Sequence, residues 1–525
     1  MRSEYSLVDE PWLPVQMGDG TVRSVGLLEA FHRSGEIVAL AETEPPSLIA
    51  QYRMLLATVH RALVRSRGTW KDSERVTWFR RGLPVGEICA YLESLRERFW
   101  LFDAEHPFMQ VPALATAEET RDKRKPWTQI SLASANGNAP VVFDHAVDSV
   151  PASISRQAAI THLLGFLQFT PGGLVKTLRD ADKAGALVNT AAVLPVGSTL
   201  AQTLCLALHP PPLPGQSQPD LPAWERAPLT LAELRGDPVL ATGPNDRYTR
   251  QSRAVLLESE PDGQVRWLRF AAGWALGEDP QRPDPMACYR AGSNGLVRVS
   301  FTEGRAVWRD LPALVPAPQA AGLEGARVAA VVNWAAGLHR LMGVAAGYPQ
   351  RLLVAGLASD QAKLLRWRLE QFALPQALLV EPDRARELHA HVALAEELHR
   401  QLRAIATDLV AMTLPDPRSK DSRSRARELV ERGPLSPTYF ATAERELWAL
   451  MTCIARDEPD EADALWHRAL RDAGRLAWKP LVDGLGFSPR ALQAEARCRP
   501  RLNRLLRQHL PAAFAVPADT QPEEA

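Results

Sequence analysis

The last part of the chain repeats apolar residues at three- and four-residue intervals, and this periodicity restricts the fold most. One stretch keeps it over about eight helical turns, through Leu388, Val392, Ala395, Leu398, Leu402, Ile405 and Leu409. Shorter stretches with the same period follow at 437–456, 460–478 and 488–510. Such stripes are buried when helices pack on one another, so the sequence predicts an antiparallel four-helix bundle over 379–513.

Residues 1–378 mix two periodicities. Trp12-Leu13-Pro14-Val15 and Thr21-Val22 flank Gly18-Asp19-Gly20, which predicts a β-hairpin. Alternating runs between 255 and 310 predict strands, and helical periods occur at 47–67, 86–98, 155–169, 326–345 and 360–373. We therefore expect an α+β protein: a large mixed domain over 1–378, the bundle, and a disordered tail over 514–525.

Composition excludes several classes of protein. The chain has 525 residues, 46% of them hydrophobic, so it can bury ordinary cores. Its five cysteines never form a C-x-x-C pair, and we expect neither disulfides nor a zinc site. The uncharged segment 184–208 is interrupted by polar residues, Pro195 and Gly197, which argues against a membrane span. No secretory signal opens the sequence, so we expect a cytoplasmic protein.

Catalytic signatures are missing from the sequence. It contains no phosphate-binding loop, H-E-x-x-H helix or nucleophile elbow. Gly172-Gly173-Leu174-Val175-Lys176-Thr177 lacks the glycine that a phosphate-binding loop places before its lysine. Glu387, His389 and His391 lack metal-ligand spacing and fit a solvated helix face. We expect no enzymatic activity, no metal and no cofactor.

Basic residues are clustered, although the 61 Lys and Arg balance the 61 Asp and Glu at a net charge of +0. One cluster lies at 121–125, a second lies at 418–427 in an expected loop, and a third follows one face of the last helix through Arg490, Arg497, Arg501 and Arg504. Each cluster alone fits a solubilising surface, but together they favour contact with nucleic-acid phosphates.

Several segments resemble one family. They are Trp12-Leu13-Pro14-Val15 with its hairpin, Ala104-Glu105-His106-Pro107-Phe108-Met109-Gln110, and Arg327-Val328-Ala329-Ala330-Val331-Val332-Asn333. In content and order, essentially the whole chain resembles the CasA-type large subunit of the type I-E CRISPR Cascade complex.

The resemblance implies recognition without catalysis. Such a subunit reads the protospacer-adjacent motif (PAM) of double-stranded DNA, starts strand separation, helps hold the displaced strand and recruits the helicase-nuclease. Its expected partners are crRNA, target DNA and the backbone, small and crRNA-end-capping subunits. Base pairing would read the long sequence and protein only the PAM, as in other RNA-guided effectors.

The resemblance also implies sites. The family's glycine loop, whose backbone approaches the minor groove, is similar to the turn at Gly172 and Gly173. Propensity alone fits an ordinary helix-terminating turn there equally well. The family's strand-separating glutamine wedge is similar to Gln361, with Ser359 and Asp360 before it. The alternative is a helix with Ser359 as N-cap and Gln361 as its second residue.

Other contacts follow from the same resemblance. The loop that touches the crRNA end and the PAM corresponds to 136–145, through Val142, Phe143 and Asp144, with Phe143 placed to stack on a base. Arg250 and Arg253 stand in for the DNA-facing hairpin lysine. Arg497, Arg501 and Arg504 would contact the DNA backbone from the bundle. The family's cysteine-rich insertion is absent, in agreement with the expectation of no metal.

Two other functions stay open at this point. One is a metal-dependent nucleic-acid hydrolase that uses scattered carboxylates such as Glu105 and Asp144. The other is a scaffold whose bundle binds only protein.

Overall fold

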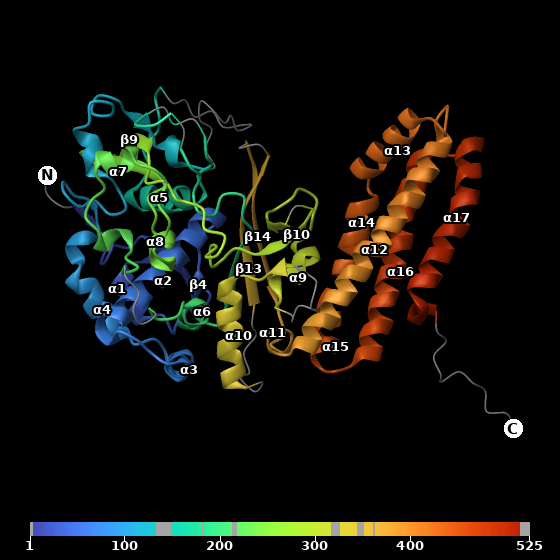
Figure 1. The fold of residues 1–525 in the computed structure, drawn as a ribbon, viewed down its shortest axis with the longest axis horizontal. Helices are drawn as coiled ribbons and strands as arrows, with labels where there is room; N and C mark the ends of the chain where they lie inside the picture. The colour runs from blue at the N-terminus through green and yellow to red at the C-terminus, as the bar shows by residue number, and fades with distance from the viewer. Residues whose placement is uncertain are drawn as a thin grey trace. The chain divides into compact units, whose positions relative to one another are not determined.

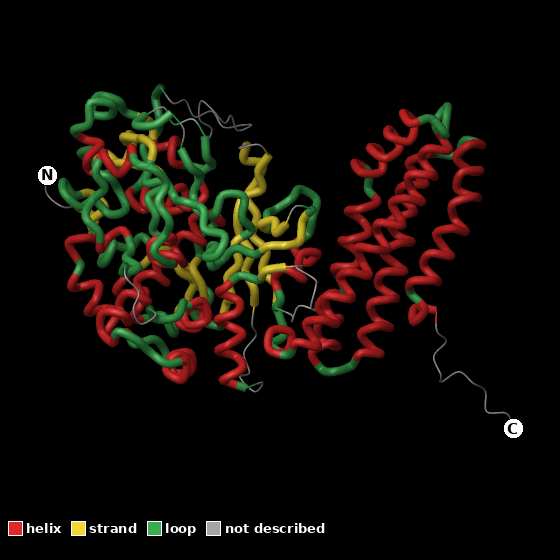
Figure 2. Tube along the Cα trace, in the orientation of Figure 1, coloured by secondary structure: helices red, strands yellow, loops and turns green. Residues whose placement is uncertain are grey.

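A computed structural model describes residues 4–132, 149–173, 175, 177–180, 182–212, 218–293, 295–316, 326–343, 351–360 and 363–514, without the side chains of 358–360 and 363–366. The chain divides into two compact units: Met1–Glu303 with Glu324–Phe372, and Gly304–Leu323 with Ala373–Ala525. The first unit combines helices with small sheets and the second is helical (Figures 1 and 2). The predicted α+β class is confirmed.

The first unit contains the predicted hairpin. β2 (Leu13–Met17) pairs with β3 (Val22–Val25) on one side and β4 (Ile37–Leu40) on the other. In the turn, Asp19 Oδ1 accepts hydrogen bonds from the backbone N–H of Thr21 at 2.9 Å and its hydroxyl at 2.7 Å. β1 (Glu4–Ser6) pairs with β5 (Trp100–Phe102).

The helix α2 (Pro45–Arg67) is central to the first unit, because all its residues from Pro45 to Leu63 are buried. It packs against α4 (Val85–Ser94), α5 (Arg156–Phe169) and α8 (Pro244–Tyr248). With α10 (Ala330–Met342), α2, α4 and α5 match predicted helices. The other helices of this unit are α1 (Leu27–His32), α3 (Asp72–Arg81), α6 (Leu200–Ala207) and α7 (Leu231–Arg235).

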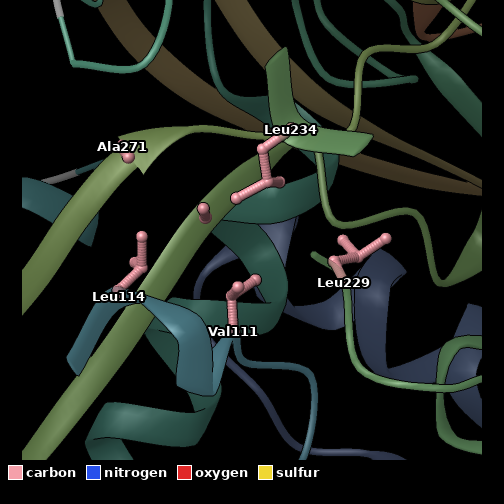
Figure 3. Packing of buried hydrophobic residues seen from close by; sticks show 6 residues of the cluster. Val111, Leu114, Leu229, Leu234 and Ala271 are labelled. Carbon is pink, nitrogen blue, oxygen red and sulfur yellow. The ribbon is translucent and has the colours of Figure 1, made fainter. Parts of the chain in front are cut away.

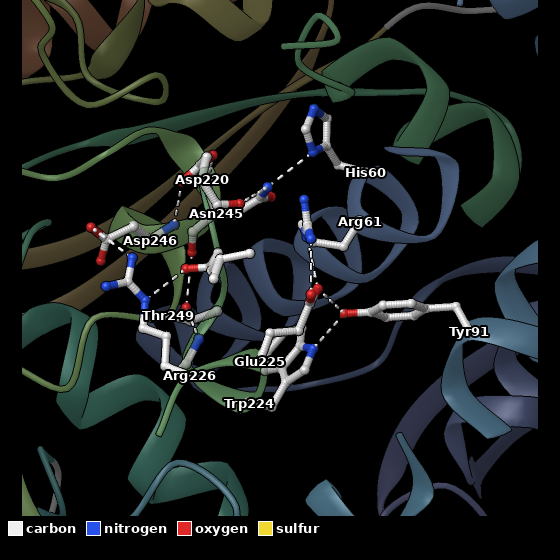
Figure 4. Close-up of polar contacts among 12 residues, drawn as sticks. His60, Arg61, Tyr91, Asp220, Trp224, Glu225, Arg226, Asn245, Asp246 and Thr249 are labelled. Atoms are coloured by element: carbon white, nitrogen blue, oxygen red, sulfur yellow. Dashed lines mark hydrogen bonds and ion pairs between the residues drawn. The ribbon is translucent and has the colours of Figure 1, made fainter. Parts of the chain in front are cut away.

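Polar side chains buried beside α2 are paired. Arg61 binds both carboxylate oxygens of Glu225, at 2.7 and 2.8 Å, and the Tyr91 hydroxyl donates to the same carboxylate at 2.7 Å (Figure 4). Arg53 forms a fully buried ion pair with Asp284 and donates to Gln168 Oε1 at 2.9 Å. A buried arginine requires such partners, and these contacts connect α2 to distant parts of the chain.

The first unit also contains two further three-stranded sheets. β9 (Val265–Ala272) lies between β6 (Lys125–Pro126) and β8 (Arg253–Ser259), and β10 (Tyr289–Gly292) lies between β11 (Gly295–Arg298) and β12 (Ala326–Arg327). β8, β9, β10 and β11 agree with the strands predicted between 255 and 310, whereas β6 and β12 lie outside that range. A hydrophobic cluster packs at β8 and β9 and contains Val111, Leu114, Leu229, Leu234, Ala254 and Ala271 (Figure 3).

The helix predicted over 360–373 is wrong. Residues Arg351–Asp360 form β13 and Lys363–Ala373 form β14, which lie next to each other in a sheet with β7 (Ala192–Val196). β13 pairs with β7 through residues 351–355. The alternative that Ser359 caps a helix is therefore also wrong.

The second unit consists of packed helices. The long helices are α12 (Pro382–Thr413), α16 (Pro459–Leu485) and α17 (Pro489–His509). Between α12 and α16 in sequence lie three shorter helices, α13 (Lys420–Arg432), α14 (Leu435–Glu444) and α15 (Leu447–Ala455). Thus α12, α14 with α15, α16 and α17 fall in the four predicted segments, whereas α13 forms where a loop was expected (Figure 1). The short helices α9 (Leu311–Leu314) and α11 (Ala377–Val380) precede α12.

The boundary and one segment of this unit differ from expectation. The unit begins again at Ala373 rather than 379, and it includes residues 304–323. The basic run at 418–427, expected in a loop, extends into α13, because Ser419 caps that helix by accepting from the Ser422 N–H at 3.1 Å. The described part of the predicted tail is Phe514, and 515–525 lie outside the described residues. No helix among the described residues has the length and apolarity needed to cross a membrane.

Candidate nucleic-acid interface

The glycine turn follows directly on the end of α5. Thr170 ends the helix with its N–H bonded to Phe166 O, and Pro171, Gly172 and Gly173 come next. Gly173 pairs with Asp182: the Gly173 N–H donates to Asp182 O at 3.2 Å, and the Asp182 N–H donates to Gly173 O at 2.9 Å. The turn does terminate a helix, as one reading predicted, and it also opens a loop that closes on itself at Asp182.

The backbone of this turn is accessible. Gly172 and Gly173 are exposed, and a methyl group placed on Gly173 would meet no atom of the described residues within 4 Å. The same group on Gly172 would lie 3.3 Å from the Ala184 nitrogen. At that position the described residues leave the Gly173 backbone open to an approaching nucleic-acid groove.

The buried Arg253 side chain binds the glycine turn from the interior of the unit. Its guanidinium donates to Pro171 O at 2.5 Å and Lys183 O at 2.7 Å, and it forms an ion pair with Asp182 Oδ2 at 2.9 Å. The Asp182 carboxylate also accepts the Gly273 N–H at 2.8 Å. These contacts anchor both ends of the glycine loop to β8 and the residue after β9.

The burial of Arg250 and Arg253 contradicts the prediction that they contact DNA. Both are buried, Arg250 pairs with Asp246 at 2.8 Å, and its guanidinium stacks 3.6 Å from the ring centre of Trp274. Burial lowers the pKa of Arg250 to about 10 and also lowers that of Arg253. Their charges are used by internal carboxylates rather than offered to phosphates.

Lys183 is a cation that sequence reasoning missed. It is exposed directly after Asp182, and its side chain has no ion-pair partner among the residues that the structure describes. Only its place in the closed loop reveals it, because the sequence around Lys183 contains no basic cluster.

The β13–β14 hairpin passes the same end of α5. A methyl group placed on Gly356 would lie 2.4 Å from Thr190 O and 3.5 Å from Phe169, the last residue of α5. Asp360 follows four residues later, about 13 Å further along an extended strand. Ser359 and Asp360 are thus on a strand, and Gln361 lies outside the described residues, between β13 and β14 in sequence. Hairpin and glycine turn converge on the end of α5.

Val142, Phe143 and Asp144 also lie outside the described residues, together with the rest of 133–148. The prediction that they contact the crRNA end and the PAM stays a prediction.

On the bundle, Arg497, Arg501 and Arg504 are exposed on α17, as predicted. The opposite face of the helix is buried through Ala494, Cys498, Leu502, Leu505 and Leu506. Arg501 forms an ion pair with Asp408 of α12 at 2.8 Å. In the cluster at 121–125, Arg121 pairs with Asp122 at 3.0 Å and Arg124 with Glu258 at 2.7 Å.

The Glu105–Gln110 motif is a structural element. Phe108 is buried and its ring centre lies 5.1 Å from that of Phe99. The Gln110 amide donates to Leu101 O at 2.6 Å and accepts the Leu257 N–H at 2.7 Å. The motif therefore joins β5 to β8, and Glu105 at its start is exposed.

A group with metal-ligand proximity occurs at Cys453, Glu458 and Glu461, the one such group in the described part of the chain. Burial and the nearby Glu458 raise the pKa of the Cys453 thiol. The group shares no residue with the carboxylates considered for a hydrolase.

Comparisons with known proteins identify the family. The family model of CRISPR-associated protein Cse1 matches residues 6–477. The chain is also 33% identical over 516 residues to CRISPR-associated protein CasA/Cse1 of Thermus thermophilus, covering 96% of this chain and 97% of that protein. This chain belongs to the Cse1 family. The predicted resemblance to a CasA-type subunit is confirmed.

Solved structures agree with the Cse1 assignment. The structure of Thermus thermophilus CasA (Cse1) superposes with a TM-score of 0.81 at 31% identity, covering 97% of this chain and 100% of that one. A chain of a CRISPR RNA-guided surveillance complex has the same fold, with a TM-score of 0.72 at 22% identity over 96% of this chain and 100% of the other.

Proposed function

We propose that this Cse1 chain is the non-catalytic, PAM-reading large subunit of an RNA-guided CRISPR surveillance complex. It would recognise the PAM of double-stranded DNA, begin strand separation, help to hold the displaced strand and recruit a helicase-nuclease. Its partners would be crRNA, target DNA and the other Cascade subunits. Family membership supports this role, and so does the likeness to a chain of a CRISPR RNA-guided surveillance complex.

The observation that carries the proposal is the accessible backbone of Gly173, which follows the end of α5 that β13 contacts through Gly356. Minor-groove edges offer few distinguishing groups, so a close backbone approach suits a short motif. The buried Asp182–Arg253 pair keeps that backbone in place. Gln361 follows β13 in sequence and would enter the opened base step, as intercalating side chains do in other minor-groove proteins. Lys183 would contact a neighbouring phosphate.

The test is PAM-dependent binding by the assembled complex. Gly173→Ala adds a methyl group on the accessible side, and we expect roughly tenfold weaker binding to a duplex with a matched PAM, the loss of one good groove contact. Gly20→Ala is the matched control, because Gly20 also has a positive φ and equally open surroundings, but lies in the β2–β3 turn.

Equal binding by the Gly173 and Gly20 variants would contradict the assignment of the glycine turn. For the wedge, Gln361→Ala should slow opening of a duplex target and leave binding to a pre-melted target unchanged. Equal loss on both targets would refute that role. If omitting the whole subunit changed neither affinity nor PAM discrimination, the proposed function itself would be wrong.

A further inference from the structure

The helical unit contains a groove that is lined in part by the basic run at 418–427 and otherwise by residues outside the predicted sites. It has a volume of about 790 Å³ and lies between α12 and α13, with Arg309 of the 304–323 segment at its edge. Its charged lining consists of five arginines, Arg309, Arg400, Arg403, Arg423 and Arg427, and three carboxylates, Glu396, Glu397 and Asp408. All these residues belong to one compact unit.

Each of the three carboxylates already has an arginine partner. Glu396 accepts two hydrogen bonds from Arg309, at 2.6 and 2.9 Å, and Glu397 accepts from Arg400 Nε at 2.9 Å. Asp408 pairs with Arg501 of α17 at 2.8 Å. The acidic groups of the groove are therefore neutralised, and they would repel an anion only weakly.

Three arginines remain without a carboxylate partner. Arg403, Arg423 and Arg427 form no ion pair within the described ranges, and all three line the groove. Arg423 and Arg427 are four residues apart on α13, so they share a face with a rise of about 6 Å between them. Arg403 comes from α12, so the guanidiniums approach the groove from both walls.

The formation of α13 creates this arrangement. In a loop, Arg423, Arg425 and Arg427 would point in unrelated directions. As part of a helix, two of them align toward α12, whereas Arg425 is exposed elsewhere and does not line the groove.

We propose that this groove binds the phosphate backbone of a single-stranded nucleic acid through Arg403, Arg423 and Arg427. Guanidinium groups match phosphate oxygens in charge and geometry. Arg403 on α12 and the two arginines on α13 would contact a single nucleic-acid strand from opposite sides. In a duplex, the complementary strand would occupy one of these two sides. The lining contains no aromatic platform besides the buried His399, so binding would follow the backbone and be independent of sequence. The inference rests on the proposed function, which produces a displaced strand.

The experiment measures binding of a fluorescent thymidine oligonucleotide to the full chain over a series of salt concentrations. Arg403→Gln, Arg423→Gln and Arg427→Gln are combined in one variant. Each phosphate contact on a single strand contributes about 0.7 to the salt slope, so we expect this variant to lose roughly 2 from the slope and at least about tenfold in affinity at low salt. The control combines Arg445→Gln, Arg456→Gln and Arg468→Gln, which removes the same charge from exposed positions of the same unit that lie outside the groove and outside the three basic clusters, and it should bind as the unmodified chain does.

Several outcomes would overturn the proposal. They are equal losses in both triple variants, no measurable binding by the unmodified chain at low salt, equally tight binding of a duplex, and competition by polyglutamate as effective as competition by unlabelled oligonucleotide. The last would indicate an acidic protein partner.

A separate measurement distinguishes this inference from the proposed function. In the assembled complex, the groove variant should keep its preference for a matched over an altered PAM. If the unmodified complex shows no PAM preference, the proposed function fails whatever the groove binds. If the variant alone loses that preference, the groove is not a separate strand-binding site.

Discussion

The buried Asp182 carboxylate fixes the position of the exposed glycine turn. It accepts hydrogen bonds from Arg253, from the Gly273 N–H at 2.8 Å and from the Lys183 N–H at 2.9 Å. The side chains of Asp182 and Arg253 are almost fully buried. Removing one charge of such a pair leaves the other buried and uncompensated, which costs far more than the net worth of the pair.

Asp182→Asn should therefore lower the free energy of unfolding by about 3 kcal/mol, because the Arg253 guanidinium loses its counter-charge. Urea denaturation followed by far-UV circular dichroism measures this loss. Asp180→Asn is the control, since Asp180 is exposed two residues away in the same loop. Similar effects of both substitutions would show that the buried pair contributes little.

His60 gives the first unit a dependence on pH. Its Nε2–H donates to Pro210 O at 3.1 Å, its Nδ1 accepts from Asn245 at 2.9 Å, and its ring stacks 3.5 Å from that of His209. Burial lowers the pKa of His60 to about 3. His60 is therefore protonated below about pH 6.5 in the unfolded chain, but only below about pH 3 in the folded chain.

Stability should consequently fall as pH falls from about 6.5 toward 3, and His60 contributes about 1.4 kcal/mol per pH unit to this slope. His60→Gln keeps a donor and an acceptor but cannot titrate. We expect the variant to show a shallower loss of unfolding free energy between about pH 7 and about pH 5. An unchanged slope would show that His60 is not the group responsible.

The sequence could not reveal the roles of single buried residues. An arginine that follows a polar run, as Arg253 does, is indistinguishable from a DNA-facing cation until its partner is known. That partner, Asp182, is 71 residues away in the chain. Lys183 was missed for the converse reason, because its exposure depends on the closure of the same loop.

At the level of elements, the β13–β14 hairpin depends on a glycine where it crosses another segment. Gly356 lies against Thr190 O, and a methyl group there would come within 2.4 Å of that backbone oxygen. Backbone atoms cannot move aside as the end of a flexible side chain can. Any larger residue must displace the hairpin or the segment before β7.

Gly356→Ala should lower stability by about 1–3 kcal/mol, the usual cost of overpacking, and slow the opening of a matched duplex target. Thermal melting and a strand-opening assay measure the two effects. Gly337→Ala is the matched control, because Gly337 lies in α10 with open space around it and alanine should raise helix stability slightly there. Parallel behaviour of the two variants would contradict the crowding argument.

Helices with a clear apolar stripe could be predicted, and elements with conflicting signals could not. α2, α5, α12, α16 and α17 show the helical period and were expected. In 363–373, Arg366, Arg368 and Glu370 alternate with Trp367 and Leu369, which is a strand pattern, but the segment is rich in residues that favour helices. Pairing with β13, a tertiary effect, decides the outcome. The sequence predicts a loop in place of α13 because the charged residues of this helix obscure its buried Ala426 and Val430.

For the whole molecule, the discontinuous second unit determines where the chain can be cut. Trp308 is buried and its ring centre lies 5.9 Å from that of Phe440 and 6.0 Å from that of Trp466, so this tryptophan is part of the helical core. Arg309 reinforces the attachment through Glu396. The net charge of the chain is +0, yet the groove between α12 and α13 contains arginines in excess of carboxylates, and those carboxylates are already paired. A neutral net charge is therefore compatible with a local anion-binding groove.

A chain truncated after residue 378, the boundary expected from sequence, should expose Trp308, Leu311 and Leu314 and lose solubility, because apolar core residues of the removed unit remain behind. Binding of an apolar fluorescent dye and size-exclusion chromatography measure this. A second truncated chain, ending at 372 with a glycine-serine linker in place of 304–323, should bind less dye. Equal dye binding by the two would contradict the assignment of 304–323 to the helical unit.

The segment 304–323 has an evolutionary consequence as well. The chain enters the helical unit at Gly304, leaves it after Leu323 and enters it again at Ala373. A gene fusion at the 372/373 junction would therefore separate the long helices from Trp308, which is buried in their core. The helical unit therefore cannot be exchanged between genes as a single contiguous cassette, and recombination within this family should preserve both halves of it together.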